Sequence, residues 1–208
     1  MKEYELIFKK FQNYTMISKN VYFSNLKLSN MFSLISGAIV ECGTWRGGMI
    51  AGIAYLLGSE RNYLLFDSFQ GLPPVKEIDG KAAFKWQSNK DSPYYYNNCT
   101  ASEEDAYKAM KIAGINNRTI IKGWFKDTLP KADFKDGIAI LRMDADWYDS
   151  TLEILNNLFK HVNKGGLIII DDYYVWDGCS KAVHDYLSKN KCTERIRTYN
   201  EICYIIKE

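Results

Sequence analysis

Residues 39–48, with the sequence IVECGTWRGG, restrict the fold of this chain more than any other stretch. An apolar run ends in the carboxylate of Glu41, a glycine turn begins at Gly43, and a helical pattern follows the turn. Parallel α/β sheets present a nucleotide-like ligand at the carboxyl end of their first strand in this arrangement. We therefore expect Glu41, Cys42, Gly43 and Thr44 to lie at the ligand-binding edge of such a sheet.

From residue 38 onward, short apolar runs bounded by turn residues alternate with helical patterns. The sequence predicts strands at 38–42, 62–67, 118–122, 137–143 and 166–170, and helices at 47–58, 101–113, 149–161 and 177–189. A final pair of strands, 194–198 and 201–206, is predicted to form a hairpin. The alternation favours a doubly wound, mostly parallel α/β sheet, and the hairpin adds an antiparallel edge.

Two regions lie outside this alternation. Residues 1–36 carry apolar clusters at helical spacing, and we expect a helical extension that covers the site or joins copies of the chain into a homo-oligomer. Residues 70–100 hold three of the four prolines and several aromatic residues. A structureless loop of that length is usually an active-site lid or a disordered insertion. Because aromatic residues in a loop favour closure over a ligand, we predict a lid.

Charge and cysteine content exclude several classes of protein. The formal net charge is +2 and no basic block occurs, so a nucleic-acid partner is not expected. The five cysteines are scattered without a C-x-x-C pair, which is typical of reduced thiols rather than a disulfide framework. The first residues do not resemble a signal peptide, and no apolar run is long enough to span a membrane. We predict a cytoplasmic protein that does not bind membranes.

The turn after the first predicted strand differs from known phosphate-binding patterns. Its glycines Gly43, Gly47 and Gly48 do not match the dinucleotide fingerprint G-x-G-x-x-G, and no G-K-[ST] of a P-loop is present. The carboxylate of Glu41 is unsuited to a pyrophosphate but suits a ligand with a cationic amine. The alternative is that Gly43 only makes a turn and Glu41 is a solvated strand end.

Asp67 ends the second predicted strand and is followed by Ser68 and Phe69. An acidic residue at this position hydrogen-bonds the ribose hydroxyls of nucleotides in α/β proteins. Phe69, or Trp124 after Gly123 at the end of the third strand, could then stack on an adenine. Each aromatic residue alone is more often part of a core, but the combination in this order indicates an adenosine-containing ligand.

The strongest site signal is a set of carboxylates at the ends of the fourth and fifth predicted strands. Asp144 and Asp146 follow one strand, and Asp171 and Asp172 follow the other. Neighbouring parallel strands lie about 4.8 Å apart, so Asp144 would meet the Asp171–Asp172 pair. Crowded carboxylates raise one another's pKa unless a cation is bound, and oxygen ligands select a hard ion such as Mg²⁺. Asp149 is expected to cap the next helix, a role that also remains open for Asp146.

Five blocks of this sequence, in order, resemble the macrocin-type O-methyltransferase family: VECGTWRGG, FDSFQGLP, GWFKDTLP, LRMDADWYDST and GGLIIIDDY. The resemblance extends over about residues 38–190. It implies an enzyme that depends on S-adenosylmethionine and Mg²⁺ and methylates sugar hydroxyls. It also implies a seven-stranded class I methyltransferase sheet, Rossmann-like with an antiparallel last strand, in a domain of residues 37–208.

The resemblance assigns cofactor and metal sites to residues singled out above. It implies that the amino acid and ribose of the cofactor are held by Glu41, Gly43, Asp67 and Ser68, with Trp124 near the adenine. It implies the metal ligands Asp144, Asp171 and Asp172.

The sequence thus predicts an O-methyltransferase for a hydroxyl of a sugar or glycosylated small molecule. Asp146 or Asp144 would accept the proton, with His184 in reserve on the helix after the aspartates. A nicotinamide-dependent oxidoreductase is one alternative, and the missing G-x-G-x-x-G speaks against it. A non-catalytic module that binds an adenosine ligand is the other, and it would not need the aspartate set.

Overall fold

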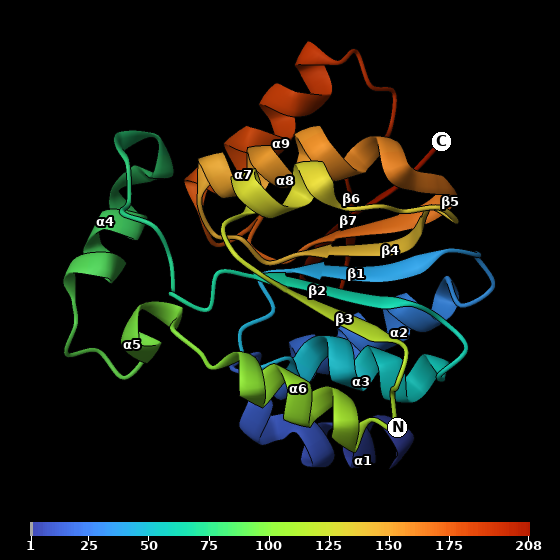
Figure 1. Ribbon diagram of the computed structural model, residues 1–208. Coiled ribbons are helices and arrows are strands. Elements are labelled where there is room, and N and C mark those ends of the chain that lie inside the picture. Colours follow the sequence, from blue (N-terminus) through green and yellow to red (C-terminus); the bar gives the residue numbers. More distant parts are fainter. Residues whose placement is uncertain (1) are drawn as a thin grey trace.

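A seven-stranded sheet forms the centre of the protein, with the strand order β3-β2-β1-β4-β5-β7-β6 (Figure 1). The structure is a computed structural model that describes residues 2–208. Its parallel strands are β1 (Ala38–Cys42), β2 (Tyr63–Asp67), β3 (Arg118–Lys122), β4 (Ile138–Met143) and β5 (Val162–Ile170). The terminal hairpin of β6 (Arg197–Tyr199) and β7 (Ile202–Ile206) joins β5 through antiparallel pairing of β7. The predicted fold class is therefore confirmed.

Helices cover both faces of this sheet (Figure 1). One face carries α1 (Lys2–Phe11), α2 (Lys19–Met31), α3 (Gly48–Leu57) and α6 (Glu103–Ile112), and the other carries α7 (Phe125–Thr128), α8 (Tyr148–Leu158) and α9 (Asp177–Lys189). A separate cluster of buried apolar side chains lies on each side, with Ile39 of β1 in one and Val40 in the other. This division follows from the alternation of side chains along a strand that is buried on both faces.

The N-terminal helices are part of the core. Ile7 and Phe11 of α1 and Tyr22 of α2 are buried in the same cluster as residues of α3. The Tyr22 hydroxyl donates a hydrogen bond to the carbonyl of Gly48 at 2.8 Å. Gly52 leaves the space for this ring, since a Cβ there would lie 1.9 Å from the Tyr22 oxygen. The connection between α1 and α2 is thereby held near the carboxyl end of β1.

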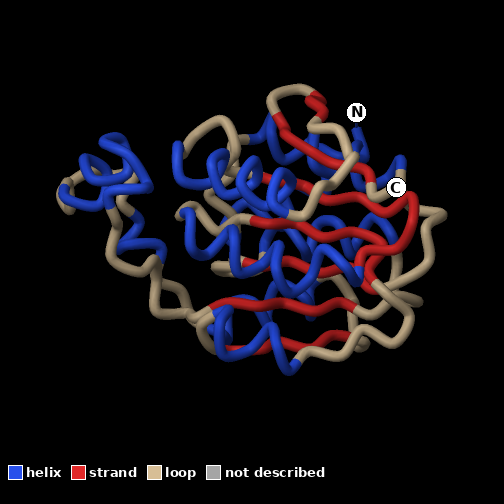
Figure 2. Tube along the Cα trace, turned by 90° about the horizontal axis from the view of Figure 1, so that it is seen from above, coloured by secondary structure: helices blue, strands red, loops and turns tan. Residues whose placement is uncertain are grey.

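Residues 70–100 lie beyond the carboxyl ends of the strands, as Figures 1 and 2 show. This insertion is not structureless, because it contains the 3-10 turn η2 (Glu77–Asp79), α4 (Gly80–Ser88) and the short α5 (Tyr96–Cys99), and its role as a lid stays a prediction. All four residues of α5 have positive φ angles, from 49° to 59°. L-residues adopt this left-handed conformation at a cost of about 1–2 kcal/mol each, with Asn the better tolerated type. The turn is therefore strained and is held by contacts outside itself.

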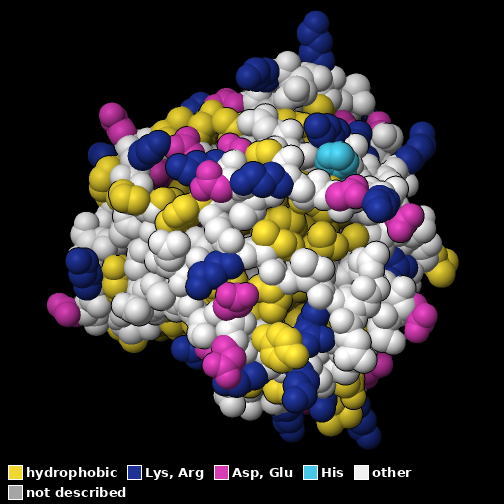
Figure 3. Space-filling view, in the orientation of Figure 1, with side chains coloured by type: hydrophobic (Ala, Val, Ile, Leu, Met, Phe, Trp, Pro, Cys, Tyr) yellow, Lys and Arg dark blue, Asp and Glu magenta, His cyan; other side chains and the backbone are white. Residues whose placement is uncertain are grey.

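The outer surface carries charged side chains of both signs (Figure 3). Figure 3 shows Lys and Arg side chains interspersed with Asp and Glu over the face seen in Figure 1. Among residues 2–208, no helix combines the length and the apolar character that crossing a membrane requires.

Candidate active site

A cavity of about 1610 Å³ lies along the carboxyl ends of the parallel strands. Residues at the ends of β1, β2, β4 and β5 form its floor, the segment 14–18 contributes one wall, and the insertion contributes another. The strand order reverses between β1 and β4, and open α/β sheets bind ligands at this point.

Most of the residues predicted from the sequence meet in this cavity. Its lining includes Glu41, Gly43, Thr44, Asp67, Ser68, Gly123, Trp124, Asp144, Asp146, Asp171 and Asp172. The parallel arrangement of the strands explains the convergence, since each residue stands at or just after a carboxyl end.

Three predicted residues are placed elsewhere. Cys42 has 0% exposure in the core, and its carbonyl accepts a hydrogen bond from the Asp144 amide at 2.9 Å. Phe69 is packed in the core cluster below the sheet, which corrects the expectation that it stacks on an adenine. His184 is exposed on α9, and its Nε2 lies 2.8 Å from the Tyr173 hydroxyl. Among residues 2–208, it is not one of those that line the cavity. Its position on the outer side of α9 removes it from the aspartates.

Arg142 of β4 is the central cation of the site. The register pairs it with Glu41 on β1, and its Nη1 lies 3.0 Å from Glu41 Oε1. The same guanidinium reaches Asp144 Oδ2 at 2.9 Å and Asp171 Oδ1 at 2.6 Å, while its Nε donates to Asn25 Oδ1 at 3.3 Å. Both Arg142 and Glu41 have side chains only 2% exposed. One buried cation therefore serves three carboxylates.

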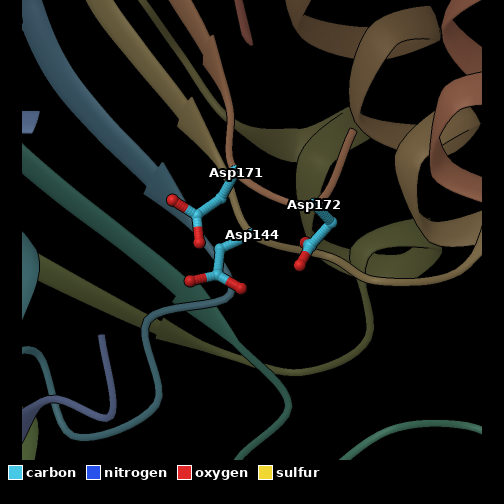
Figure 4. A group of neighbouring side chains, drawn as sticks. All are labelled: Asp144, Asp171 and Asp172. Carbon is cyan, nitrogen blue, oxygen red and sulfur yellow. The ribbon is translucent and has the colours of Figure 1, made fainter. Parts of the chain in front are cut away.

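The three aspartates predicted as metal ligands converge. Asp144, Asp171 and Asp172 each place an oxygen within 4.8 Å of the others, and Figure 4 shows their carboxylates side by side at the strand ends. Each uses another contact to fix its orientation. Arg142 holds Asp144 and Asp171, and the amides of Ala145 and Asp146 donate to Asp172 Oδ2 at 3.0 Å each.

The electrostatics of this centre favour a bound cation. Burial raises the pKa of Glu41 to about 8, and the neighbouring Asp144 adds to this although Arg142 opposes it. Burial likewise raises the pKa of Asp144 to about 6, and burial with the nearby aspartates raises the pKa of Asp172 well above its usual range. Glu41 Oε2 is buried without a hydrogen-bond partner among residues 2–208. A hard divalent ion at the aspartates and a cationic amine at Glu41 would satisfy these groups.

Asp146 lines the cavity and does not cap a helix. Its Oδ1 accepts a hydrogen bond from Trp176 Nε1 at 2.8 Å, and burial followed by the charge of Asp144 raises its pKa to about 8. Helix α8 begins at Tyr148, with no side-chain cap from its N-cap residue. Asp149 lies within the first turn of α8 and forms an ion pair with Lys76, so its predicted capping role is wrong.

The cofactor side of the cavity is built on tight backbone contacts. Gly43 has a φ of +87°, and a Cβ there would lie 1.5 Å from the Asp144 carbonyl oxygen, so no other residue fits without moving the backbone. Asp67 accepts hydrogen bonds from the amides of Trp45 and Phe69, both at 2.7 Å. Burial raises the pKa of Asp67, and these amides oppose the rise. The carboxylate therefore fixes the turn after β1 as well as facing the cavity.

The sequence analysis did not assign Arg142 or the contacts among three tryptophans to the site. Arg142 lies inside an apolar strand, and Asp144, two residues further on, is the only local feature that points to it. Trp86, Trp147 and Trp176 form a cluster of edge-to-face contacts with centroids 5.3–6.1 Å apart. They come from three distant segments, so no local pattern joins them.

The sheet order, the antiparallel last strand and the site at the strand ends define a class I methyltransferase fold. The sequence matches the family described as Macrocin-O-methyltransferase (TylF) over residues 10–207, and the chain belongs to this family.

Characterised relatives support this assignment. The demethyldecarbamoylnovobiocin O-methyltransferase of Streptomyces niveus is 36% identical over 171 residues, which cover 79% of this chain and 63% of the relative. The mycinamicin III 3''-O-methyltransferase of Micromonospora griseorubida is 30% identical, with 78% of this chain and 65% of the relative covered. The chain thus spans less than two thirds of the length of these relatives.

Solved structures agree with the fold. The O-methyltransferase NovP superposes with a TM-score of 0.77 at 30% identity, covering 93% of this chain and 82% of NovP. The calicheamicin methyltransferase CalS11 gives a TM-score of 0.69 over 99% of this chain and 91% of its own, at 16% identity, which shows a shared fold alone.

Proposed function

We propose that the protein is an S-adenosylmethionine-dependent O-methyltransferase that acts on a hydroxyl of a sugar or glycosylated small molecule with the help of Mg²⁺. The observation that carries this proposal is that a buried, unpartnered carboxylate oxygen of Glu41 and the three convergent aspartates face one cavity. Membership in the macrocin O-methyltransferase family supports the reaction, and the named substrates of its relatives support a sugar-containing acceptor.

The cofactor would occupy the β1–β2 side of the cavity. Glu41 would accept a hydrogen bond from the ammonium group of the cofactor's methionine part, and Asp67 would accept one from a ribose hydroxyl. Trp124, which lines the cavity where Phe69 does not, would contact the adenine. Gly43 permits close approach of the ligand to the turn after β1.

The acceptor would lie on the β4–β5 side, beside the aspartates. Asp144, Asp171 and Asp172 would hold Mg²⁺, which when bound supplies a Lewis acid for the acceptor hydroxyl. Asp146 faces the same cavity with one oxygen held by Trp176, so its other oxygen is the candidate proton acceptor, with Asp144 as the second candidate. The aromatic side chains that line the cavity would restrict the approach of the acceptor to the methyl group.

The charge of the cavity favours an acceptor without phosphate. Ten carboxylates line it against three cationic side chains, Lys76, Lys126 and Arg142, in contrast to the mixed charges of the face in Figure 3. Two of the three cations are already paired within the protein. The backbone amides of Ala145 and Asp146, near the aspartates, already donate hydrogen bonds to Asp172. A sugar nucleotide would therefore find few of the Arg, Lys or free amide groups with which phosphate-binding proteins hold a phosphate.

The direct test is a search by mass spectrometry for a methylated product from a panel of hydroxylated sugars and glycosides with S-adenosylmethionine and Mg²⁺. Asp171→Ala should abolish the Mg²⁺-dependent turnover and leave binding of S-adenosylhomocysteine largely intact in calorimetry. Unchanged turnover in that variant would contradict the metal assignment. Tight binding of NAD in place of S-adenosylhomocysteine would favour an oxidoreductase, and cofactor binding without any Mg²⁺-dependent thermal stabilisation would favour a binding module.

A further inference from the structure

Asp79 is a carboxylate of the insertion that the proposed reaction does not use, yet it is only 3% exposed and lies on the cavity wall. Both of its oxygens accept backbone hydrogen bonds. Oδ2 accepts from the Lys76 amide at 2.8 Å, within the insertion, and Oδ1 accepts from the Tyr148 amide at 2.7 Å. The second bond crosses from the insertion to the first residue of α8.

Helix α8 lacks a cap of its own at this end. Its N-cap residue, Trp147, offers no side-chain acceptor to the first amides. A helix N-terminus is stabilised by an acceptor for its free amides and by a negative charge. Asp79 supplies both from a distant segment. Gly178 in α9 makes the approach possible, because a Cβ there would lie 2.4 Å from Asp79 Oδ1.

The insertion holds the same loop by a second set of contacts. Trp147 donates from Nε1 to the Pro73 carbonyl at 3.0 Å, and its ring meets Trp86 of α4 at a centroid distance of 6.0 Å. Trp86 also contacts Trp176, which donates to Asp146. The loop from Asp144 to Tyr148 is therefore fixed by β4 at one end and by the insertion at the other.

This loop in turn orients one of the aspartates. The amides of Ala145 and Asp146 both donate to Asp172 Oδ2 at 3.0 Å, and Asp146 has a positive φ of 55° that presents its amide in this way. A residue other than glycine keeps a positive φ only where its surroundings hold it in that conformation. The surroundings here are Asp172 on one side and the insertion on the other.

We propose that Asp79 is a positioning residue for the aspartate centre. By fixing the first turn of α8 it keeps the Ala145 and Asp146 amides on one oxygen of Asp172, so that the other oxygen remains available beside Asp144 and Asp171. The insertion then supports the cation site as well as forming a wall. This inference rests on the proposed function, which supplies the cation. Binding of the cofactor, on the side that β1 and β2 build, should not depend on Asp79.

The test compares Asp79→Asn with Asp91→Asn, which removes an exposed carboxylate of the same insertion. Calorimetric titration with Mg²⁺, on protein saturated with S-adenosylhomocysteine, should show at least about tenfold weaker cation binding for Asp79→Asn, the lower end of the effect of removing a group that supports a metal ligand. Binding of S-adenosylhomocysteine itself should stay within about twofold of the wild type, and Asp91→Asn should resemble the wild type in both. Unchanged Mg²⁺ affinity in folded Asp79→Asn overturns the proposal.

Gly178→Ala provides a second route if Asp79→Asn does not fold. Alanine is the better helix former, yet its Cβ would lie 2.4 Å from Asp79 Oδ1 and 3.0 Å from the Tyr148 nitrogen. It would force the two groups apart, so the same loss of Mg²⁺ affinity is expected. Residue-resolved amide exchange separates this proposal from the proposed function. If wild-type protein binds no Mg²⁺, the cation assignment fails, but faster exchange at Ala145 and Asp146 in the variants still supports positioning by Asp79. Faster exchange at Tyr148 alone would reduce Asp79 to a local cap and overturn it.

Discussion

The floor of the cavity, which the sheet forms, and the wall that the insertion forms are built in different ways. On the sheet side, the charged groups lie in or just after the last residues of the strands, and the register of β1 against β4 places Glu41 beside Arg142. On the insertion side, Asp79 and Pro73 reach partners 69 and 74 residues away in the sequence. The sheet side concentrates charge on a rigid scaffold, whereas the insertion side provides aromatic contacts and support. Substitutions on the two sides should therefore differ in both size and kind.

The largest effect is expected at Arg142. Arg142→Met leaves Glu41, Asp144 and Asp171 without their shared cation, and removing one partner of a buried ion pair costs about 3–5 kcal/mol. Urea unfolding in the absence of Mg²⁺ measures this loss. Arg46→Met is the matched control, because Arg46 is 44% exposed and lies 3.8 Å from Asp105, so less than about 1 kcal/mol is expected. Equal losses of unfolding free energy in the two variants would show that Arg142 does not stabilise the three carboxylates around it.

The sheet side should also make stability depend on pH. Glu41 and Asp146 have pKa values of about 8 in the folded protein, above the ordinary 4.5 and 3.8 of these groups. Between pH 5 and 8 the folded state therefore holds protons that the unfolded state has released, so the free energy of unfolding falls as pH rises. We expect the free energy of unfolding to decrease by at least about 1.4 kcal/mol from pH 5.5 to 8, which corresponds to a tenfold difference in proton affinity between the folded and unfolded states.

Denaturant unfolding in EDTA at several pH values measures this decrease. Glu41→Gln should flatten the profile, because the amide has no proton to release. Mg²⁺ should flatten it as well, by stabilising the ionised aspartates. Stability that rises with pH in the metal-free protein would contradict the assigned burial of these carboxylates.

The same contrast explains what the sequence could predict. Asp144 and Asp171 follow apolar runs, and the topology of parallel sheets brings such positions to one edge, so the convergence of the aspartates was predicted. Arg142 was missed because burial of a cation inside an apolar strand has no local pattern. The helices inside the predicted lid were not foreseen, because the order of the insertion depends on partners such as Tyr148 and Trp147, which no spacing in residues 70–100 reveals.

A smaller effect is expected in the aromatic cluster of the insertion. Trp86→Ala removes contacts to Trp147 and Trp176, and aromatic pairs contribute about 0.5–1.5 kcal/mol each beyond their buried area. We expect a loss of about 1–3 kcal/mol in urea unfolding and weaker acceptor binding, with binding of S-adenosylhomocysteine unchanged. Phe84→Ala on the same helix is the control, since Phe84 is 43% exposed. A loss of cofactor affinity in Trp86→Ala would show that the two sides of the cavity are not separate.

The smallest effects are expected where φ is positive, and their signs should differ between an asparagine of the insertion and a glycine outside the cavity. Asn97 in the turn of α5 has a φ of 53° and its residue is exposed, so Asn97→Gly relieves strain and should stabilise the protein by up to about 1 kcal/mol. Gly58 at the end of α3 has a φ of +90° with open space around its Cβ position, so Gly58→Ala should destabilise it by about 1–2 kcal/mol through conformation alone. Thermal unfolding of both variants measures the pair. Destabilisation by Asn97→Gly would mean that the asparagine side chain holds the turn through a contact, and that the strain of α5 is compensated within the turn itself.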